Sequence, residues 1–368
     1  MTTKRVFVTA LACALGALAL AACQPKGGGA SNSAAGGGAA PSGTDVSGAG
    51  ATFPAPVYTK WAEDYKAKSN VGLNYQAIGS GGGIKQIEAG TVDFGASDKP
   101  LKPEDLDKNG LYQFPTVVGG IVPAVNLPGI QTGQLKLTGA VLADIFLGNI
   151  KTWNDPKIAA LNPGLKLPAT PITSVHRSDG SGTNFLFTTY LASLSPEFQT
   201  KVGASDSVQW PNGLGGKGNP GVAAFVRQTV GSIGYVEYIY AQQNHIPYAL
   251  VQNHDGQYPQ PVAANFAAAA AGADWTKAPG NYLILLNQPG ANSWPITGAT
   301  FILLHKSSKD AVRTQGALKF FDWAYTNGDA TASNLAYVPL PQAVKDMVRK
   351  QWSDQLKGPD GKPVWPAQ

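Results

Sequence analysis

The chain has 368 residues, a length that suggests two domains; 43% of them are hydrophobic and only 14% are charged, against about a quarter in typical soluble domains. This composition excludes a disordered charged chain and a coiled coil. Beyond the N-terminus no apolar run reaches the roughly 18 residues that a spanning helix needs, which excludes a multi-pass membrane protein. The formal net charge is +5, with no cluster of Lys and Arg, so we expect no nucleic-acid partner.

Residues 1–22 have the pattern of an export signal peptide. Lys4 and Arg5 precede a run rich in Ala and Leu that is too short to span a membrane comfortably. The run ends in Leu-Ala-Ala-Cys, which resembles the lipobox of bacterial lipoproteins. In that family the signal is cut before the cysteine, which then carries acyl chains, so we expect lipidation of Cys23. The alternative is an ordinary signal peptide with a cysteine nearby.

The segment 23–43 begins with this cysteine and continues as a low-complexity stretch of Gly, Ala, Ser and Pro, which is typical of a flexible tether. The only two cysteines of the chain are Cys13 and Cys23. Because the first would leave with the signal and the second would carry lipid, we expect no disulfide, no thiol nucleophile and no cysteine-ligated metal in the folded domain.

The rest of the sequence alternates helix-like and strand-like segments. A helix is predicted from Pro56, because Val57, Trp61 and Tyr65 recur on one helical face. The predicted strands cover 71–78, 92–96, 116–126, 172–176, 233–240 and 300–304. The other predicted helices run over 84–90, from a cap at Thr138, after residue 183, from a cap at Asn219 to residue 226, and over 317–325 and 342–352. This alternation predicts an α/β fold around buried, largely parallel sheets, with segment 116–126 crossing between domains.

Three glycine-rich turns, at 50–53, 79–81 and 179–183, each stand before a helix start. Each pairs a hydroxyl with glycines that let backbone N–H groups approach a ligand closely. The helix N-terminus adds free N–H donors and a partial positive charge. Three such termini facing one cleft, with Arg177 entering the third, would hold a tetrahedral oxyanion. Taken singly, each turn is more typical of an ordinary helix cap.

Signatures of catalysis are missing from the sequence. Neither Ser80 nor Ser181 has the flanking glycines of a nucleophile elbow, and no Gly-Lys-Ser/Thr sequence completes a Walker pattern. The four histidines, at positions 176, 245, 254 and 305, are scattered without metal-ligand spacing. We therefore expect no catalytic residue, no bound metal and no cofactor.

A carboxylate at Asp98 is unexpected in an anion site, because it repels a fully ionised ligand. It becomes useful when the ligand carries a proton that the carboxylate accepts. Phosphate at neutral pH carries at least one proton and sulfate carries none, so Asp98 would admit phosphate and reject sulfate. The alternative is that Asp98 caps the turn that follows it.

Seven motifs resemble those of the phosphate-binding proteins of high-affinity phosphate ABC transporters, a family of periplasmic substrate-binding proteins. They lie at residues 48–58, 75–87, 92–98, 177–183, 213–219, 233–238 and 320–325. The resemblance extends over nearly all of residues 46–365. It implies a two-lobed periplasmic binding protein fold of type II, each lobe a mainly parallel sheet flanked by helices, with the ligand cleft between the lobes. Lobe I would comprise residues 44–120 and 297–368, and lobe II residues 121–296.

The function implied by the resemblance is high-affinity binding of inorganic phosphate and its delivery to the inner-membrane permease of an ABC transporter, which works with an ATPase. Such a protein is not an enzyme. It would be exported to the periplasm or cell envelope, would be monomeric, and would contact the membrane only through its lipid anchor.

The same resemblance implies which residues hold the ion. The implied phosphate contacts are Ala51, Thr52, Phe53, Ser80, Asp98, Arg177, Ser181, Gly182 and Thr183. Asp98 would accept the phosphate proton, and Asp179 would pair with Arg177 and temper its charge. The alternatives are a receptor for another tetrahedral oxyanion such as sulfate, a secreted phosphohydrolase, and an additional role as a surface adhesin.

Overall fold

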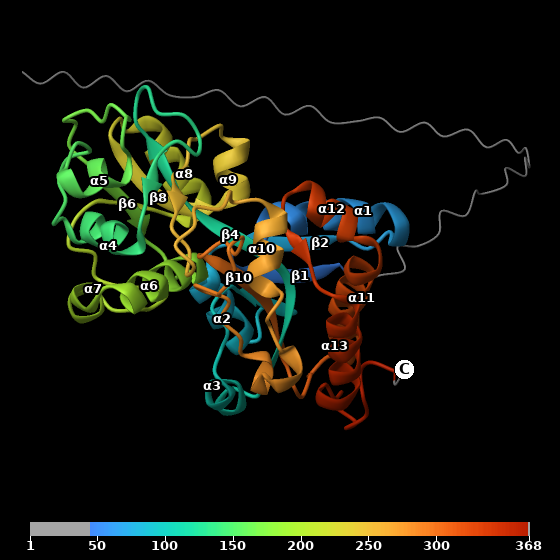
Figure 1. Ribbon diagram of the computed structural model, residues 1–368. Coiled ribbons are helices and arrows are strands. Elements are labelled where there is room, and N and C mark those ends of the chain that lie inside the picture. Colours follow the sequence, from blue (N-terminus) through green and yellow to red (C-terminus); the bar gives the residue numbers. More distant parts are fainter. Residues whose placement is uncertain (1–44, 367–368) are drawn as a thin grey trace, which may run out of the picture. The chain divides into compact units, whose positions relative to one another are not determined.

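The structure, a computed structural model, describes residues 45–366 (Figure 1). The predicted signal peptide at 1–22, the lipidation of Cys23 and the tether at 23–43 lie outside the described residues. Between residues 45 and 366, none of the helices combines the length and the apolar character needed to cross a membrane. Strands and helices alternate along this part of the chain, which confirms the predicted α/β class.

Within residues 45–366, nine strands form a mixed sheet, and the other two, β5 and β9, pair with each other. The strands are β1 (Val46–Gly50), β2 (Leu73–Ala77), β3 (Phe94–Ser97), β4 (Leu111–Asn126), β5 (Lys136–Leu137), β6 (Thr173–Arg177), β7 (Leu214–Gly216), β8 (Ser232–Glu237), β9 (Leu250–Val251), β10 (Thr297–His305) and β11 (Val338–Pro339). The order across the large sheet is β2-β1-β3-β10-β4-β8-β6-β7, with β11 paired to β4.

The long strand β4 joins two parts of this sheet. Its residues up to Gly120 pair with β10, and those from Ile121 onward pair with β8. We call β2, β1, β3 and β10 the first half of the sheet, and β8, β6 and β7 the second half. Each half contains parallel pairs at its outer end, and antiparallel pairs meet at β4. The division into lobes at 120/121 stays a prediction, and this change of partner falls at the same place.

Proline inside β4 explains a local irregularity of the sheet. Pro115 has no N–H to donate to the ladder. Opposite it, the register of β10 shifts between Thr300 and Phe301, as a β-bulge does. The residue left out of the pairing is Thr116 of β4, and it lies opposite the part of β10 that contains Thr300, whose hydroxyl bonds to Asp98.

The helices cover both halves of the sheet. They are α1 (Ala55–Ser69), α2 (Ser80–Glu88), α3 (Pro103–Lys108), α4 (Gly139–Leu147), α5 (Pro156–Leu161), α6 (Gly182–Leu194), α7 (Pro196–Lys201), α8 (Gly218–Gln228), α9 (Tyr238–Gln243), α10 (Ala263–Ala270), α11 (Ala311–Asn327), α12 (Asp329–Asn334) and α13 (Gln342–Gln355), with short 3₁₀ turns η1 (Trp275–Lys277) and η2 (Pro279–Asn281). In Figure 1, α4, α6 and α7 lie together near β6 and β8, whereas α1, α11 and α12 group around β1 and β2.

Three sequence expectations about element ends were wrong. The strand expected over 233–240 ends at Glu237, because that side chain accepts a hydrogen bond from the N–H of Ile239 at 3.0 Å and caps α9. Helix α2 begins at Ser80 rather than Ile84, since three successive glycines still adopt helical geometry there. Asn219 lies inside α8, whose N-cap is Lys217. The expected cap at Thr138 is confirmed, since its hydroxyl accepts from the N–H of Val141.

Buried aromatic side chains fix the helices on the sheet. In the first half, the ring of Phe114 on β4 packs edge-on against Phe321 and Trp352, with centroid distances of 5.6 and 5.1 Å. In the second half, Phe187 of α6 stacks on Tyr235 of β8 at 4.1 Å. Such pairs contribute about 0.5–1.5 kcal/mol each beyond the apolar area that they bury.

Candidate functional site

The predicted phosphate contacts follow the carboxyl ends of parallel strands, where α/β sheets place their ligands. In the first half of the sheet, β1 leads into Thr52, β2 into Ser80 and β3 into Asp98. In the second half, β6 ends at Arg177 and leads into the turn before α6. All of these side chains are buried. The structure therefore gathers residues from four strand ends into one polar cluster.

The two halves of the sheet meet directly at Ser80. Its hydroxyl oxygen accepts hydrogen bonds from the N–H of Gly182 at 3.0 Å and from the N–H of Asp98 at 3.2 Å. A Cβ atom on Gly182 would lie 2.7 Å from the Ser80 hydroxyl oxygen and 2.6 Å from the Cβ of Asp98, closer than packed atoms approach. Only glycine at position 182 lets the helix start come this near.

A second close approach supports the same junction. The N–H of Gly81 donates to the carbonyl oxygen of Gly180 at 2.9 Å, and a Cβ on either residue would lie 3.1 Å from the other's Cα. The glycines that sequence analysis connected with ligand approach thus also bring the two turns together.

Asp98 supplies a carboxylate from the end of β3, and only 1% of its surface is exposed. Burial raises its pKa to about 7, against the opposing effects of the Thr300 hydroxyl, the Arg177 charge and the hydroxyls of Thr183 and Ser80. The Thr300 hydroxyl donates to Oδ1 at 2.9 Å. The turn after β3 is held by Ser97, whose hydroxyl donates to the carbonyl of Lys99 and accepts from its N–H. The Asp98 carboxylate is therefore not needed as a turn cap.

The raised pKa of Asp98 makes the stability of the ligand-free protein depend on pH. A carboxyl that binds its proton more tightly in the folded than in the unfolded state stabilises the fold below about pH 4, and this contribution is lost as pH rises to about 7. We expect the unfolding free energy of the wild type to fall across this window by a few kcal/mol more than that of Asp98→Asn. Urea unfolding at pH 4.5, 6 and 8 measures the difference; parallel curves for the two proteins would contradict it.

Arg177 enters the cluster with its charge already paired. Its Nε donates to Oδ1 of Asp179 at 2.8 Å, and its Nη2 donates to Oδ2 at 2.6 Å. Burial favours the neutral acid, but the hydrogen bonds and charge of Arg177 outweigh it and hold the pKa of Asp179 below its ordinary value. Oδ1 of Asp179 also accepts from the N–H of Gly218. The bidentate pair fixes the guanidinium plane and leaves Nη1 out of the pairing.

Several backbone donors of the cluster find no acceptor in the protein. Within residues 45–366, the N–H groups of Thr52, Phe53 and Thr183 make no hydrogen bond, although all three residues are buried. Buried N–H groups are nearly always paired. In the first turn of α6, Gly182, Asn184 and Phe185 do have acceptors. The unpaired donors coincide with three of the positions that the sequence indicated.

Two predicted contacts are engaged elsewhere. The N–H of Ala51 donates to the carbonyl of Ala96, and its own carbonyl accepts from the hydroxyl of Tyr75 at 2.7 Å. The hydroxyl oxygen of Ser181 caps α6 by accepting from the N–H of Asn184 at 3.0 Å. The N–H of Ala51 is therefore already paired, whereas the hydroxyl proton of Ser181 remains available.

Residues that the sequence did not assign to the site surround Thr52 and Phe53. Their carbonyls accept hydrogen bonds from the hydroxyls of Tyr240 and Tyr337, at 2.5 and 2.6 Å. Asn219 donates to the hydroxyls of Thr52 and Thr183. Asn219 and the start of α9 lie within the motifs at 213–219 and 233–238, so the sequence did indicate that these segments matter. No motif of the sequence indicated Tyr337.

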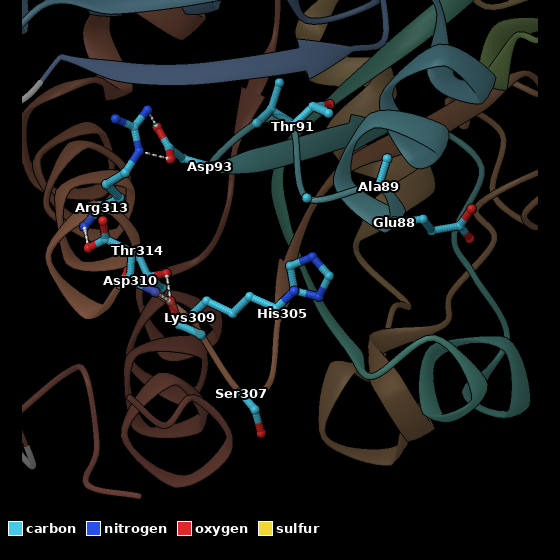
Figure 2. A pocket seen from close by; sticks show the side chains of 13 residues that line it. Glu88, Ala89, Thr91, Asp93, His305, Ser307, Lys309, Asp310, Arg313 and Thr314 are labelled. Carbon is cyan, nitrogen blue, oxygen red and sulfur yellow. Dashed lines mark hydrogen bonds and ion pairs between the residues drawn. The ribbon is translucent and has the colours of Figure 1, made fainter. Parts of the chain in front are cut away.

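The described part of the chain also has an open pocket of about 420 Å³ that includes none of the predicted residues. It is lined by the end of α2, the end of β10 and the start of α11, and Figure 2 shows Arg313 pointing at Asp93 there. The guanidinium binds both carboxylate oxygens, at 2.5 and 2.9 Å. Arg313 is therefore already paired with a carboxylate in this pocket. Among residues 45–366 no three His, Cys, Asp or Glu side chains gather as a metal-binding group.

Comparison with known proteins places the chain in a family. A family model described as "PBP superfamily domain" matches residues 35–327. The phosphate-binding protein PstS of Pasteurella multocida is 54% identical over 320 residues, which cover 87% of this chain and 93% of that protein. The chain belongs to the PstS family of phosphate-binding proteins. PstS of Haemophilus influenzae is 53% identical over 312 residues, covering 85% of this chain and 93% of that protein.

Solved structures that resemble this PstS family member agree on the fold. A phosphate-binding protein from Stenotrophomonas maltophilia superposes with a TM-score of 0.64 at 22% identity, covering 84% of this chain and 94% of that one. A putative phosphate ABC transporter substrate-binding protein from Clostridium perfringens, solved with bound phosphate, gives 0.60 at 20% identity, covering 81% and 100%. These matches confirm the predicted periplasmic binding protein fold of type II.

Proposed function

We propose that this chain is a receptor that binds inorganic phosphate and delivers it to the membrane permease of an ABC transporter. Membership of the PstS family supports the ligand and the transporter. The single observation that carries the proposal is the buried cluster, in which unpaired N–H groups of Thr52, Phe53 and Thr183 gather with one carboxyl, Asp98, from both halves of the sheet. An oxyanion with one proton satisfies both kinds of group.

In the proposed complex, hydrogen-bond donors surround the ion, and the carboxyl of Asp98 accepts a hydrogen bond from its proton. The three N–H groups, the hydroxyls of Thr52, Ser80, Ser181 and Thr183 and the Nη1 of Arg177 donate to phosphate oxygens. Asp98 shares a proton with one of them. Sulfate has no proton to share, so its oxygen would face the carboxylate and lose binding energy. This is why we favour phosphate over another tetrahedral oxyanion.

The ion enters when the two halves of the sheet separate. In the structure Gly182 N–H, the Ser80 hydroxyl and Asp98 N–H form a continuous contact, and a ligand cannot pass through buried, touching backbone. Separation breaks these hydrogen bonds. Phosphate then brings the two halves together again by accepting hydrogen bonds from donors on both sides. Closure on the ligand is thus part of the proposed function.

The proposed role is binding without chemistry. Its relatives carry names of binding proteins, and we assign this chain no catalytic residue. No observation favours the phosphohydrolase or the adhesin over the receptor.

We further propose that the chain is exported and anchored by acylated Cys23, works as a monomer and touches the membrane only there. Mass spectrometry of the mature N-terminus tests the anchor: an unmodified terminus would reject it.

Calorimetric titration of the phosphate-free protein tests the proposed function. We expect one phosphate per chain, with a dissociation constant below about 1 μM, equivalent to roughly 8 kcal/mol. A thousandfold excess of sulfate should leave the phosphate isotherm unchanged. No heat on adding phosphate, or equal affinity for the two anions, would refute the proposal.

A further inference from the structure

Asn219, in the first turn of α8, connects three elements of the buried cluster. It is fully buried. Its backbone N–H and its Nδ2 donate to the hydroxyl oxygen of Thr52, at 3.1 and 2.9 Å, and Nδ2 also donates to that of Thr183 at 3.2 Å. Its Oδ1 accepts from the N–H of Glu237 at 2.9 Å. One amide thus touches two predicted phosphate contacts, one after β1 and one at the start of α6.

The orientation of this amide is fixed by its surroundings. If the amide were turned over, its NH₂ group would face the N–H of Glu237, donor against donor. The bond from Glu237 to Oδ1 therefore holds Nδ2 towards the two threonines. Because an amide NH₂ group only donates, both hydroxyl oxygens must accept from it.

These hydrogen bonds restrict where the hydroxyl protons of Thr52 and Thr183 can point, more strongly for Thr52 than for Thr183. A hydroxyl has one proton to donate and two lone pairs that accept. The oxygen of Thr52 accepts from both nitrogens of Asn219, so its acceptor capacity is used and its proton must be donated elsewhere. The oxygen of Thr183 accepts once, which turns its proton away from Asn219 as well.

We propose that Asn219 is a positioning residue that forces the hydroxyls of Thr52 and Thr183 to act as donors towards the bound ion. This inference rests on the proposed function and extends it to specificity. With both hydroxyls committed as donors, the ion must present proton-free oxygens to them. Its proton can then be accepted only at Asp98. Asn219 thus sets the orientation of the bound phosphate, in which its proton points at the Asp98 carboxylate.

The isosteric variant Asn219→Asp tests this directly. The new carboxylate keeps the bond from Glu237 but can only accept at its other oxygen, so the two hydroxyls would donate to it and turn lone pairs towards phosphate. We expect calorimetry at pH 8 to show at least a 100-fold loss of phosphate affinity. Asn292→Asp, which adds the same charge at an exposed turn, should bind as the wild type does.

A pH profile separates positioning from a merely structural role. Protonation of the new carboxyl restores a donor, so the affinity ratio of wild type to Asn219→Asp should shrink as the pH is lowered from 8 to 5.5. The other ionisable groups near Asn219, which are Asp98, Arg177, Asp179 and Glu237, are present in both proteins, so the ratio reports mainly on the substituted side chain. A ratio that stays constant over the range would overturn the proposal.

A double-mutant cycle provides a second test if the aspartate variant does not fold. Asn219→Ala and Thr183→Val are measured singly and together. If Asn219 acts through the Thr183 hydroxyl, its removal should cost at least threefold less affinity in the Thr183→Val protein. If the affinity loss of the double mutant equals the product of the two single losses, the inference is overturned.

Absence of phosphate binding by the wild type would reject the proposed function and this inference together, whereas normal wild-type binding with an unimpaired Asn219→Asp protein rejects the inference alone.

Discussion

Replacing Gly182 by alanine is expected to weaken phosphate binding roughly 10- to 100-fold, without unfolding the protein. The added Cβ would lie 2.6 Å from the Cβ of Asp98 and 2.7 Å from both the N of Asp98 and the hydroxyl oxygen of Ser80. Overpacking of this kind costs about 1–3 kcal/mol. The ligand-free protein can avoid the overlap by separating the two halves of its sheet, but the closed complex cannot.

Calorimetry and thermal unfolding distinguish this effect from a general loss of stability. Alanine is a better helix former than glycine, so the start of α6 should tolerate it, and the melting temperature without phosphate should change little. The rise in melting temperature on adding phosphate should shrink. Gly272→Ala is the matched control, because a Cβ there meets nothing within 4 Å. Wild-type affinity in Gly182→Ala would show that the contact between the halves is not needed for binding.

Asp98→Asn is expected to remove most of the discrimination between phosphate and sulfate. The carboxylate only accepts, and it is buried, so in the proposed complex it would face a ligand oxygen away from water. The amide that replaces it has the same shape but can donate to a proton-free oxygen. Leaving a buried polar group wrongly paired costs about 1–3 kcal/mol, and more for a charged group. We therefore expect the ratio of phosphate to sulfate affinity to fall by at least 100-fold.

The control for this experiment is the same chemical change at Asp179. That carboxylate pairs with Arg177, so Asp179→Asn should alter the affinities for both anions in parallel and leave their ratio nearly unchanged. Because the pKa of Asp98 is raised to about 7, the wild-type ratio should itself fall below that pH, where protonated Asp98 can donate to sulfate. An Asp98→Asn protein that still rejects sulfate would remove Asp98 from its proposed role.

Much of the cluster could be predicted from the sequence because its main residues follow strands directly. Thr52, Ser80 and Asp98 stand one to three residues after β1, β2 and β3, and parallel strands deliver their carboxyl ends to one edge. The same reasoning, with the glycine-rich turn at 179–183, placed the start of α6. Local pattern indicated these turns and the unusual carboxylate at Asp98, whereas the assignment of individual phosphate contacts came from the resemblance to the family and stays a prediction.

Other features depend on contacts between distant segments that no local pattern encodes. Thr300 faces Asp98 across 202 residues, and Tyr337 reaches the carbonyl of Phe53 across 284. The sequence suggested Asn219 as a helix cap, since Asn is common at that position. In the structure its amide instead donates hydrogen bonds to the hydroxyls of two threonines from other segments. Glu237 ends β8 because its own side chain caps α9, which strand propensity alone could not indicate.

A crystal structure of the protein grown with phosphate tests the central claim most directly. We expect one phosphate ion enclosed between the two halves of the sheet, with oxygens within about 3 Å of the N–H groups of Phe53 and Thr183 and of the Asp98 carboxylate. Phosphate found only at the open pocket beside Arg313, or a cluster that stays closed and empty at saturating phosphate, would contradict it.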